Sequence, residues 1–389
     1  MKTVGIIAEY NPFHNGHAYL VQKAREAGAT HVVAVMSGNF VQRGEPALFS
    51  HDVRARAALM NGVDLVLQLP SVYAVSTAQS FAQAGVKILD SLGCVDELIF
   101  GSECGDISKI KRAVGAVNSE EIKPLLAYEL QKGLSFAVAR ENALKKFSPE
   151  SADIIKNPNN ILGIEYVAAI EKLGSKMNPV TFERTGAAHD SNKAGKNIAS
   201  ASHIRELING GKWEDFVPEN TVEIYKNIPV ADIKRIEGAI LYKMRTVKKE
   251  ELAKTPDISE GIENRIISAA EKATKLEELY SFAKTKRYSH ARIRRIVLNS
   301  FLGVTSEALQ TPVPYIRVTG FNKNGAELIR KAKDAAQLPL ITKAADIACL
   351  GPDAQLIFSA ECRAGDVFAL CFENIMPCGN EKSIKPIII

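Results

Sequence analysis

The chain has 389 residues, of which 46% are hydrophobic and 24% are charged, and its net charge is +5. This is ordinary globular composition, so it excludes a disordered, fibrous or collagen-like protein and predicts two or three domains. No stretch approaches the roughly 20 apolar residues of a membrane helix, and the apolar run at residues 4–8 is too short for a secretion signal. We therefore expect a soluble, cytoplasmic protein.

The first 120 residues alternate apolar, strand-like runs with helical patterns. Strands are expected at 3–8, 31–36, 64–69 and 97–101, and helices at 17–27, 51–61 and 75–92. Because the strands are apolar on both faces, they predict an α/β fold with a doubly wound parallel sheet covered on both sides. Such sheets bind ligands at the carboxyl ends of their strands. The loops after Ala8, Met36, Leu69 and Phe100 should therefore share one rim.

The rest of the chain is mainly helical by pattern. A break at 157–160 interrupts a helical region at 120–175, and a strand at 181–184 precedes a short helix at 202–209. The glycines at 210 and 211 and the prolines at 218 and 229 mark a boundary. Further helices are expected at 231–247, 259–283, 289–302 and 325–336, with strands at 315–320 and 338–342. These patterns predict a catalytic domain at 1–210, a linker at 211–230 and a mixed, largely helical domain at 231–389.

The most informative local feature is the sequence NPFHNGH at residues 11–17, which follows the first strand and opens a helix. A helix N-terminus presents unpaired N–H groups and the positive end of the helix dipole. Two imidazoles beside it can donate hydrogen bonds to a phosphate, and Gly16 lets the backbone approach it closely. We therefore predict that His14 and His17 are catalytic. The alternatives are a turn with two incidental histidines, or a zinc pair, which the spacing and the missing third ligand disfavour.

A second feature is the sequence IASASHIR at residues 198–205, where small hydroxyl residues precede a helix start. Ser200 and Ser202 could cap this helix or donate to the same phosphate. Arg205 is expected in the first turn, where a cation opposes the helix dipole unless an anion is bound. Taken alone, an ordinary helix cap explains the pattern equally well. Together with the histidine motif it predicts a site, with Arg205 as a third catalytic residue.

These two motifs resemble the nucleotidyltransferase superfamily with the HxGH signature, whose second motif reads S/T-S/T-x-I-R. Ala201 and His203 depart from the commonest form of that second motif. Longer blocks are similar to the bacterial tRNA(Met) cytidine acetate ligase family, and they span nearly the whole chain. The blocks are EYNPFHNGH (9–17), MSGNFVQRGEPA (36–47), FGSE (100–103), NPNNILGIEY (157–166), SASHIR (200–205), YSHARIRRIVLNSFLG (288–303) and YIRVTGFNKNGAELI (315–329).

The resemblance implies a ligase that forms acetyl-adenylate from ATP and acetate. It then transfers the acetyl group to N4 of the wobble cytidine of elongator tRNA(Met). Mg²⁺ is expected with the ATP, although no carboxylate cage is evident. The ATP-binding residues implied in this way are Ile7, Ala8, Glu9, Tyr10, Asn11, Pro12, Phe13, His14, Asn15, Gly16, His17, Ala18, Tyr19, Leu20, Gly101, Asn160, Arg184, Ser200 and Ser202.

Three of these positions have structural alternatives. Glycine at 101 leaves space for the base or ribose, or simply forms a turn at a strand end. Asn160 could cap a helix, and Arg184 could be a surface charge at a strand end.

Positive charge is concentrated late in the chain. Residues 283–333 contain eleven Lys and Arg against two Glu, which suggests a polyanionic partner. Arg43, in the loop after the second strand, is a candidate for binding acetate or an RNA phosphate. Tyr288 could stack on a base, or be a packed aromatic, and the arginines could serve acids of the protein itself. The predicted tRNA contacts are Arg43, Lys286, Arg287, Arg292 and Arg295.

Two other functions remain open. A cofactor-type adenylyltransferase acting on a small phosphate ester would share the first site, but it gives no reason for a basic second domain. A non-catalytic RNA-binding protein is disfavoured because His14, His17 and Arg205 are all present. The six cysteines form no CxxC pair, so we expect free or buried thiols. The oligomeric state stays open.

Overall fold

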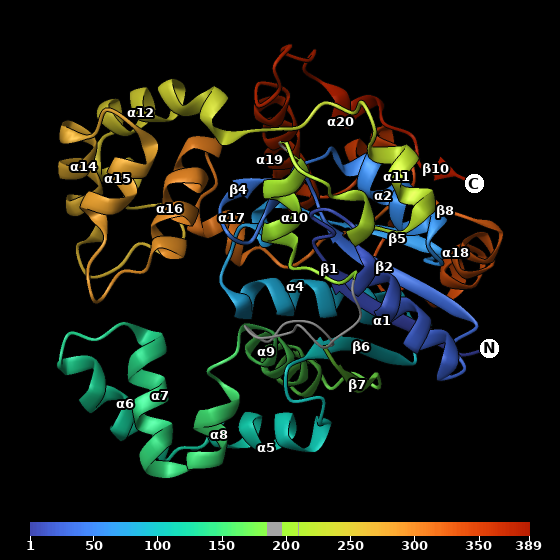
Figure 1. The fold of residues 1–389 in the computed structure, drawn as a ribbon, viewed down its shortest axis with the longest axis horizontal. Coiled ribbons are helices and arrows are strands. Elements are labelled where there is room, and N and C mark those ends of the chain that lie inside the picture. Colours follow the sequence, from blue (N-terminus) through green and yellow to red (C-terminus); the bar gives the residue numbers. More distant parts are fainter. Residues whose placement is uncertain (185–196, 209) are drawn as a thin grey trace.

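The computed structural model describes residues 1–184, 197–208 and 210–389. Its centre is one sheet with the strand order β10-β8-β5-β2-β1-β6-β7, and β9 pairs with β8 (Figure 1). In the first half of the chain, the strands that belong to this sheet pair parallel with one another, which confirms the doubly wound parallel sheet predicted there. The strands of this half are β1 (Thr3–Ala8), β2 (His31–Ser37), β5 (Leu65–Leu69), β6 (Glu97–Ser102) and β7 (Asn178–Glu183).

Alternate side chains of the central strands enter two different cores. Val33 and Val35 pack on one face with α4 (Ala78–Ser91) and α9 (Pro158–Leu173). Val32 and Ala34 pack on the other face with α1 (Asn15–Glu26) and α2 (His51–Met60). The central strands β2 and β5 are therefore buried on both sides, which is why most of their residues are apolar instead of every second one.

The strand order reverses beside β1. The chain runs outward from β1 to β2 and β5, and then returns to place β6 on the other side of β1. The switch point therefore lies between the carboxyl ends of β1 and β6, where open α/β sheets bind ligands. The histidine motif follows β1 and Gly101 lies on β6, so both are at this point.

Two helical lobes extend from the same side of the sheet in Figure 1. The lower lobe comes between β6 and α9, and the upper lobe follows α10 (Ala201–Ile208) and α11 (Glu219–Tyr225). The lower lobe consists of α5 (Ile107–Asn118), α6 (Ile122–Gln131), α7 (Phe136–Phe147) and α8 (Pro149–Ile154). The upper lobe consists of α12 (Glu237–Thr246), α13 (Lys249–Leu252), α14 (Ile262–Lys272), α15 (Leu276–Ala283) and α16 (His290–Leu302).

After the upper lobe, the chain returns to the sheet. β8 (Ile316–Phe321) pairs antiparallel with β5, while β9 (Leu340–Ile341) and β10 (Ile387–Ile388) pair parallel with β8. The strands expected at 315–320 and 338–342 therefore exist, but they extend the first sheet instead of forming a separate one. The linker at 211–230 stays a prediction. The helices of this last part are α17 (Ser306–Gln310), α18 (Lys323–Ala335), α19 (Pro352–Ala369) and α20 (Asn380–Ser383).

Buried polar groups join this last part of the chain to the predicted ligand rim. Arg317 of β8 is 4% exposed, and its Nη1 donates to Gln68 Oε1 at 3.1 Å and to Glu381 Oε2 at 2.6 Å. The other oxygen of Glu381 accepts Nδ2 of Asn39, in the loop after β2, at 3.2 Å. The carboxyl-terminal region therefore helps to hold the loop that precedes α2.

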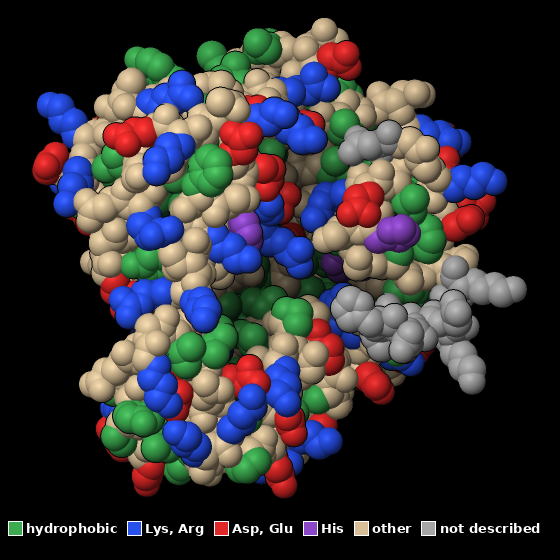
Figure 2. Space-filling model, turned by 60° about the vertical axis from the view of Figure 1, so that its left-hand side comes forward, with side chains coloured by type: hydrophobic (Ala, Val, Ile, Leu, Met, Phe, Trp, Pro, Cys, Tyr) green, Lys and Arg blue, Asp and Glu red, His purple; other side chains and the backbone are tan. Residues whose placement is uncertain are grey.

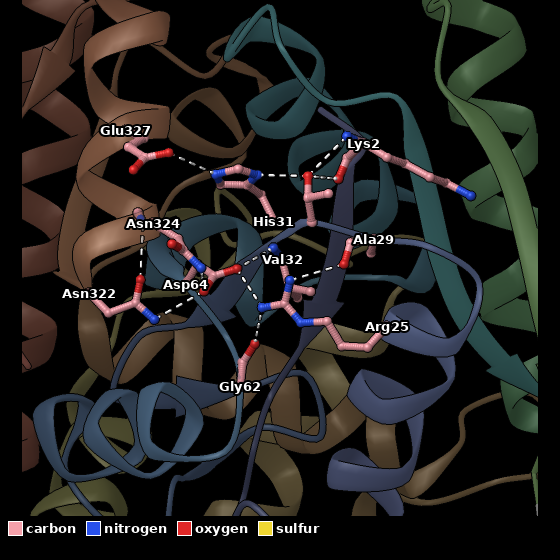
Figure 3. A network of polar contacts seen from close by, with 12 residues as sticks. Lys2, Arg25, Ala29, His31, Val32, Gly62, Asp64, Asn322, Asn324 and Glu327 are labelled. Carbon is pink, nitrogen blue, oxygen red and sulfur yellow. Dashed lines mark hydrogen bonds and ion pairs between the residues drawn. The ribbon is translucent and has the colours of Figure 1, made fainter.

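A second polar network lies at the amino ends of the strands, opposite the predicted ligand rim (Figure 3). Asp64 Oδ2 accepts Arg25 Nη2 at 2.6 Å and the N–H of Val32 at 2.7 Å, and Oδ1 accepts Asn322 Nδ2 at 3.0 Å. These bonds tie α1, β2 and the start of α18 together at the amino end of β5. The network lies away from the ligand rim, so its role is to stabilise the fold.

Several predicted boundaries differ from the structure. The helix predicted at 75–92 is α4, which begins at Ala78 because Thr77 Oγ1 caps it by accepting the N–H of Ser80, and the short helix α3 (Ser71–Ala74) before it was not predicted. The helix predicted at 259–283 is α14 and α15, and α1 begins at Asn15 instead of at residue 17. The predicted end of the helix at 202–209 lies outside the described residues. In the described part of the chain, no helix is long and apolar enough to span a bilayer.

Candidate active site

The two histidines lie at the start of α1, where the backbone leaves β1. His14 precedes the helix, and its Nδ1 accepts the N–H of Gly16 at 3.0 Å. The N–H of His14 donates to Nδ1 of His17 at 3.2 Å, and the two rings stack with their centroids 3.8 Å apart. Histidine here takes the capping role that serine or aspartate has at most helix starts. Both imidazoles therefore have a fixed orientation.

The hydrogen bonds also fix the protonation of these rings. Because both Nδ1 atoms accept, the proton of each neutral ring is on Nε2. Burial, and then the charge of Arg184, lowers the pKa of His14 to about 3. Burial and the neighbouring His14 lower the pKa of His17 well below its usual value. Near neutral pH the pair thus offers two Nε2–H donors beside a helix N-terminus, which is a suitable arrangement for binding a phosphate.

The stability of the protein should depend on pH through these two buried histidines. Their pKa values are lower than the usual 6.5, so the unfolded chain binds more protons below that pH. The free energy of unfolding should be highest above about pH 6.5 and fall toward pH 3, by at most roughly 1.4 kcal/mol per pH unit for each histidine. Urea unfolding of wild type and His14→Asn measures this slope. An unchanged slope in the variant would contradict it.

An open cavity lies over the start of α1 and is bounded by four separate parts of the chain. These are the turn after β1, the carboxyl ends of β6 and β7, and the residues before α10. The predicted residues that line it are His14, Gly16, His17, Tyr19, Leu20, Gly101, Arg184 and Ser200. Phe182, Glu183, Ile198 and Ala199 also line it and were not identified from the sequence. The cavity thus brings the histidine motif together with residues far apart in the sequence.

Glycine at position 101 leaves room for the side chain of Arg184. A Cβ on residue 101 would lie 2.9 Å from Cγ and 3.4 Å from Cδ of Arg184. The neighbour that requires glycine in this structure is therefore the arginine, whereas the sequence suggested the base or ribose. Arg184 is in turn held by Asn159, whose Oδ1 accepts Arg184 Nη1 at 3.3 Å.

Gly101→Ala is expected to displace Arg184 and to weaken ATP binding roughly tenfold, which corresponds to about 1.4 kcal/mol. Calorimetric titration with a non-hydrolysable ATP analogue measures this. Gly115→Ala is the matched control, since a Cβ at residue 115 of α5 would meet nothing within 4 Å. Equal affinity of Gly101→Ala and wild type would show that Arg184 does not contact the nucleotide.

Arg205 of α10 points back toward the turn after β1. Its Nη1 donates to the main-chain oxygen of Asn11 at 2.9 Å, and its Nη2 donates to Ser202 Oγ at 3.2 Å. The structure therefore brings Arg205 to the histidine motif, as predicted. It also corrects one detail, because Arg205 is in the last turn of α10 and not in the first. The expected conflict with the helix dipole does not arise there.

The two serines before Arg205 have different partners. Ser200 Oγ accepts the N–H of His203 at 3.2 Å, so Ser200 caps α10 while also lining the cavity. Ser202 Oγ accepts Nη1 of Arg43 at 3.3 Å as well as Nη2 of Arg205. Arg43 is exposed, and it lies between β3 (Phe40–Val41) and β4 (Glu45–Pro46). Two guanidinium groups therefore meet at one hydroxyl beside the histidine motif.

Asn160 supports the fold behind the cavity instead of lining it. It is 1% exposed, and its Oδ1 accepts the N–H groups of Glu103 at 2.9 Å and Cys104 at 3.1 Å. Its Nδ2 donates to the main-chain oxygen of Ile154 at 3.0 Å. The residue that precedes α9 is Asn157, so the helix-cap alternative for Asn160 is wrong. Asn160 as an ATP contact stays a prediction.

Much of the segment at residues 7–20 serves the fold. Tyr10 and Phe13 are 1% and 0% exposed, and Asn11 Oδ1 accepts the N–H of Leu48 at 2.7 Å. Tyr10 has a φ of 47°, an unusual value for a residue with a side chain and one that is frequent at functional sites. The other predicted residues of this segment outside the cavity lining are Ile7, Ala8, Glu9, Pro12, Asn15 and Ala18.

Arg54 of α2 holds the ligand rim in place and was not identified from the sequence. It is fully buried, and its Nη1 donates to the main-chain oxygens of Glu9 at 2.6 Å and Ser37 at 3.2 Å. Its Nη2 donates to Gly38 O, and its Nε donates to Phe49 O at 3.0 Å. Burial lowers the pKa of Arg54 to about 10, which leaves it charged. One guanidinium group thus joins the carboxyl ends of β1 and β2.

Two of the arginines predicted to bind tRNA have partners within the protein. Arg292 Nη2 donates to the main-chain oxygen of Asp257 at 2.8 Å and to Ser259 Oγ at 2.6 Å. Arg295 Nε donates to Asp257 Oδ2 at 2.8 Å. These bonds support the alternative interpretation, in which the arginines stabilise the upper lobe. Their contact with tRNA stays a prediction.

The neighbouring predicted residues are placed differently. Arg287 lies 3.8 Å from the carboxylate of Glu260, and Lys286 is exposed. Tyr288 is buried, and its hydroxyl donates to the main-chain oxygen of Glu260 at 2.8 Å. Tyr288 is therefore a packed aromatic and is not available to stack on a base.

The described ranges contain no group of three or more His, Cys, Asp or Glu side chains that could hold a metal ion. Because Mg²⁺ in nucleotide sites is usually bound by one or two carboxylates together with the phosphates, the Mg²⁺ expected with ATP stays a prediction. All six cysteines are free thiols, as the absence of a CxxC pair predicts.

Comparisons with known proteins agree with this geometry. The family model for HIGH nucleotidyl transferases matches residues 1–382. A tRNA(Met) cytidine acetate ligase of Clostridium kluyveri is 40% identical over 370 residues, covering 88% of this chain and 90% of that protein. One from Thermoanaerobacter sp. (strain X514) is 39% identical over 405 residues, covering both completely. The crystal structure of Thermotoga maritima TmcAL bound with α-thio-ATP has a TM-score of 0.92 and 32% identity, with complete coverage of both chains. This chain therefore belongs to the HIGH nucleotidyl transferase family and, within it, to the tRNA(Met) cytidine acetate ligases.

Proposed function

We propose that this protein is an ATP-dependent ligase that acetylates tRNA(Met). An oxygen of acetate attacks the α-phosphorus of ATP, the bond to pyrophosphate breaks, and acetyl-adenylate forms. The N4 amine of the wobble cytidine then attacks the acetyl carbon, and AMP leaves. The names of the relatives support the ligase activity and the tRNA, and the Thermotoga complex with α-thio-ATP supports the nucleotide.

The observation that carries this proposal is the pair of neutral imidazoles with both Nε2–H groups available at the start of α1. Displacement of pyrophosphate leaves negative charge on phosphate oxygens, and fixed donors stabilise that charge without reorganising. The nearby Arg184, directly after β7, and Arg205 of α10 supply positive charge. Adenylation needs no covalent protein nucleophile, because binding acetate in line with the α-phosphate is sufficient.

The shape and charge of one face of the molecule support a binding surface for tRNA. Figure 2 shows one face that is deeply hollowed, with Lys and Arg side chains along the walls and hydrophobic side chains at the base. The lobe of α12–α16 lies above this hollow and the lobe of α5–α8 lies below it. Positive walls attract a nucleic-acid backbone and make its binding salt-sensitive. We propose that elongator tRNA(Met) enters here, with Arg43 and Lys286 among its contacts, and that the protein acts in the cytoplasm.

The test uses purified protein, ATP and labelled acetate, with and without total tRNA. Acetate-dependent exchange of labelled pyrophosphate into ATP is expected without tRNA. With tRNA, label is expected in N4-acetylcytidine. Absence of both signals would show that the substrate assignment is wrong, and exchange without N4-acetylcytidine would exclude only the proposed acceptor.

A further inference from the structure

Transfer of acetyl to an amine releases a proton, and a positioned base accelerates such a step. When N4 of the cytidine bonds to the acetyl carbon, the nitrogen becomes strongly acidic and loses its proton readily to a carboxylate. His14 and His17 are unsuited to accept this proton, because their Nδ1 atoms already accept hydrogen bonds and their Nε2 atoms carry protons. The acceptor is therefore a group other than these two imidazoles.

Glu9 follows the carboxyl end of β1, five residues before His14. Its Oε1 accepts the N–H of Gln42 at 2.9 Å, and its main-chain oxygen accepts Arg54 Nη1 at 2.6 Å. The residue is thus fixed through both its side chain and its backbone. Its carboxylate lies between β1 and the loop that contains Arg43, at the strand ends where ligands of such sheets bind.

The other carboxylates near the cavity are less suited to this role. Both oxygens of Glu103 are occupied, since Oε1 accepts Asn159 Nδ2 at 2.6 Å and Oε2 accepts the N–H of Asn160 at 2.8 Å. Glu183 lines the cavity, but it is exposed at the end of β7. Within the residues that the structure describes, no hydrogen bond orients the Glu183 carboxylate.

Charged and titratable groups face Glu9 from several elements. Burial raises the pKa of Glu9, while the hydrogen bond from Gln42 and the charges of Arg43 and Arg205 oppose that rise. A carboxylate with a raised pKa is a more effective base, and the two arginines keep its ionised form accessible. The groups around it are Arg43 and Glu45 in the β3–β4 hairpin, Arg54 in α2, Tyr166 in α9 and Arg205 in α10.

We propose that Glu9 is the general base of acetyl transfer, an inference that rests on the proposed function. The bond between N4 and the acetyl carbon forms, and the bond from that carbon to the phosphate oxygen breaks. AMP leaves with the electron pair of that bond. The N4 proton passes to a carboxylate oxygen of Glu9 and then to solvent. Adenylation of acetate involves no amine, so it does not require this base.

Glu9→Gln separates the two half-reactions, because glutamine keeps the acceptor for the Gln42 N–H but is not basic. Acetate-dependent pyrophosphate exchange should stay within about threefold of wild type, whereas single-turnover acetyl transfer to tRNA(Met) should fall about 100-fold or more. Wild-type transfer should rise with pH through the pKa of Glu9, since the carboxylate is the active form. Glu9→Gln should lose this rise, and Glu9→Asp should keep it at a lower rate.

The control is Glu97→Gln, a carboxylate at the amino end of β6 that pairs with Lys2 at 3.0 Å and does not lie at the strand ends that carry Glu9. It should leave both half-reactions unchanged. Wild-type transfer rates in Glu9→Gln would overturn the proposal. Joint loss of exchange and transfer, or a higher Mg²⁺ requirement for exchange, would overturn it as well, because Glu9 would then act in ATP binding. Absence of both acetate-dependent exchange and N4-acetylcytidine formation in the wild type would instead reject the proposed function, and this inference with it.

Discussion

Asparagine in place of His17 is expected to lower the rate of acetate-dependent pyrophosphate exchange roughly 100- to 1000-fold. The asparagine oxygen can still accept the N–H of His14, which Nδ1 of His17 accepts at 3.2 Å in the wild type. Asparagine is also a favourable residue before a helix, so His14→Asn keeps the start of α1. His17→Asn and His14→Asn thus each remove one Nε2–H donor and keep an acceptor for the hydrogen bonds at the start of α1. Exchange is measured at saturating ATP and acetate, and thermal unfolding checks that each variant folds.

Two further variants define the cause of that loss. His17→Gln extends an amide N–H toward the position of the lost Nε2–H, so it should recover part of the rate. His31→Asn removes a buried histidine at the amino end of β2, where His31 Nδ1 lies 2.9 Å from Thr30 Oγ1. It should leave exchange unchanged. If His17→Asn exchanges pyrophosphate as fast as wild type, the backbone of α1 binds the phosphate without the imidazoles.

Arg54→Met is expected to lower the free energy of unfolding by about 3–5 kcal/mol, because buried main-chain oxygens lose their donor. Three of these oxygens belong to Glu9, Ser37 and Phe49. Methionine has a similar length and cannot donate. The midpoint of urea unfolding measures the effect, and catalytic activity should fall with it because the ends of β1 and β2 are no longer joined.

Arg56→Met is the matched control, since Arg56 lies on the same helix and is exposed. Its expected effect on the free energy of unfolding is within about 0.5 kcal/mol. Equal unfolding midpoints for the two variants would mean that the rim is held by other contacts. Lysine at position 54 tests the geometry, because it keeps the charge but cannot match the planar array of guanidinium donors.

The first half of the fold could be predicted because its strands are buried on both faces and its helices are local. The last part could not be predicted in the same way. β8 contains Arg317, a buried charge whose partner Glu381 is 64 residues away, so no local pattern marks a central strand. In α19, Glu361 is fully buried while Leu356 is 39% exposed, which hides the apolar face of that helix. Its residues therefore gave no helix prediction.

In the candidate site as well, local patterns could be predicted from the sequence and contacts between distant residues could not. The histidine motif is contiguous, so its place at a strand-to-helix junction could be read directly. Arg54 acts on main-chain oxygens, which no sequence displays, and it was missed. The charge count found Arg292 and Arg295, but it could not show that both donate hydrogen bonds to Asp257. The sequence therefore identifies reactive groups more reliably than it identifies their supports.

The antiparallel pairing of β8 with β5 has a consequence for synthesis of the protein. A chain that ended before residue 316 would leave β5 as an open sheet edge, whose unpaired N–H and C=O groups invite association with other chains. It would also lack Glu381, which holds Asn39. On the ribosome, the loop after β2 that contains Asn39 can thus reach its final arrangement only after almost the whole polypeptide has emerged. Premature termination should yield aggregation-prone fragments instead of a smaller working enzyme.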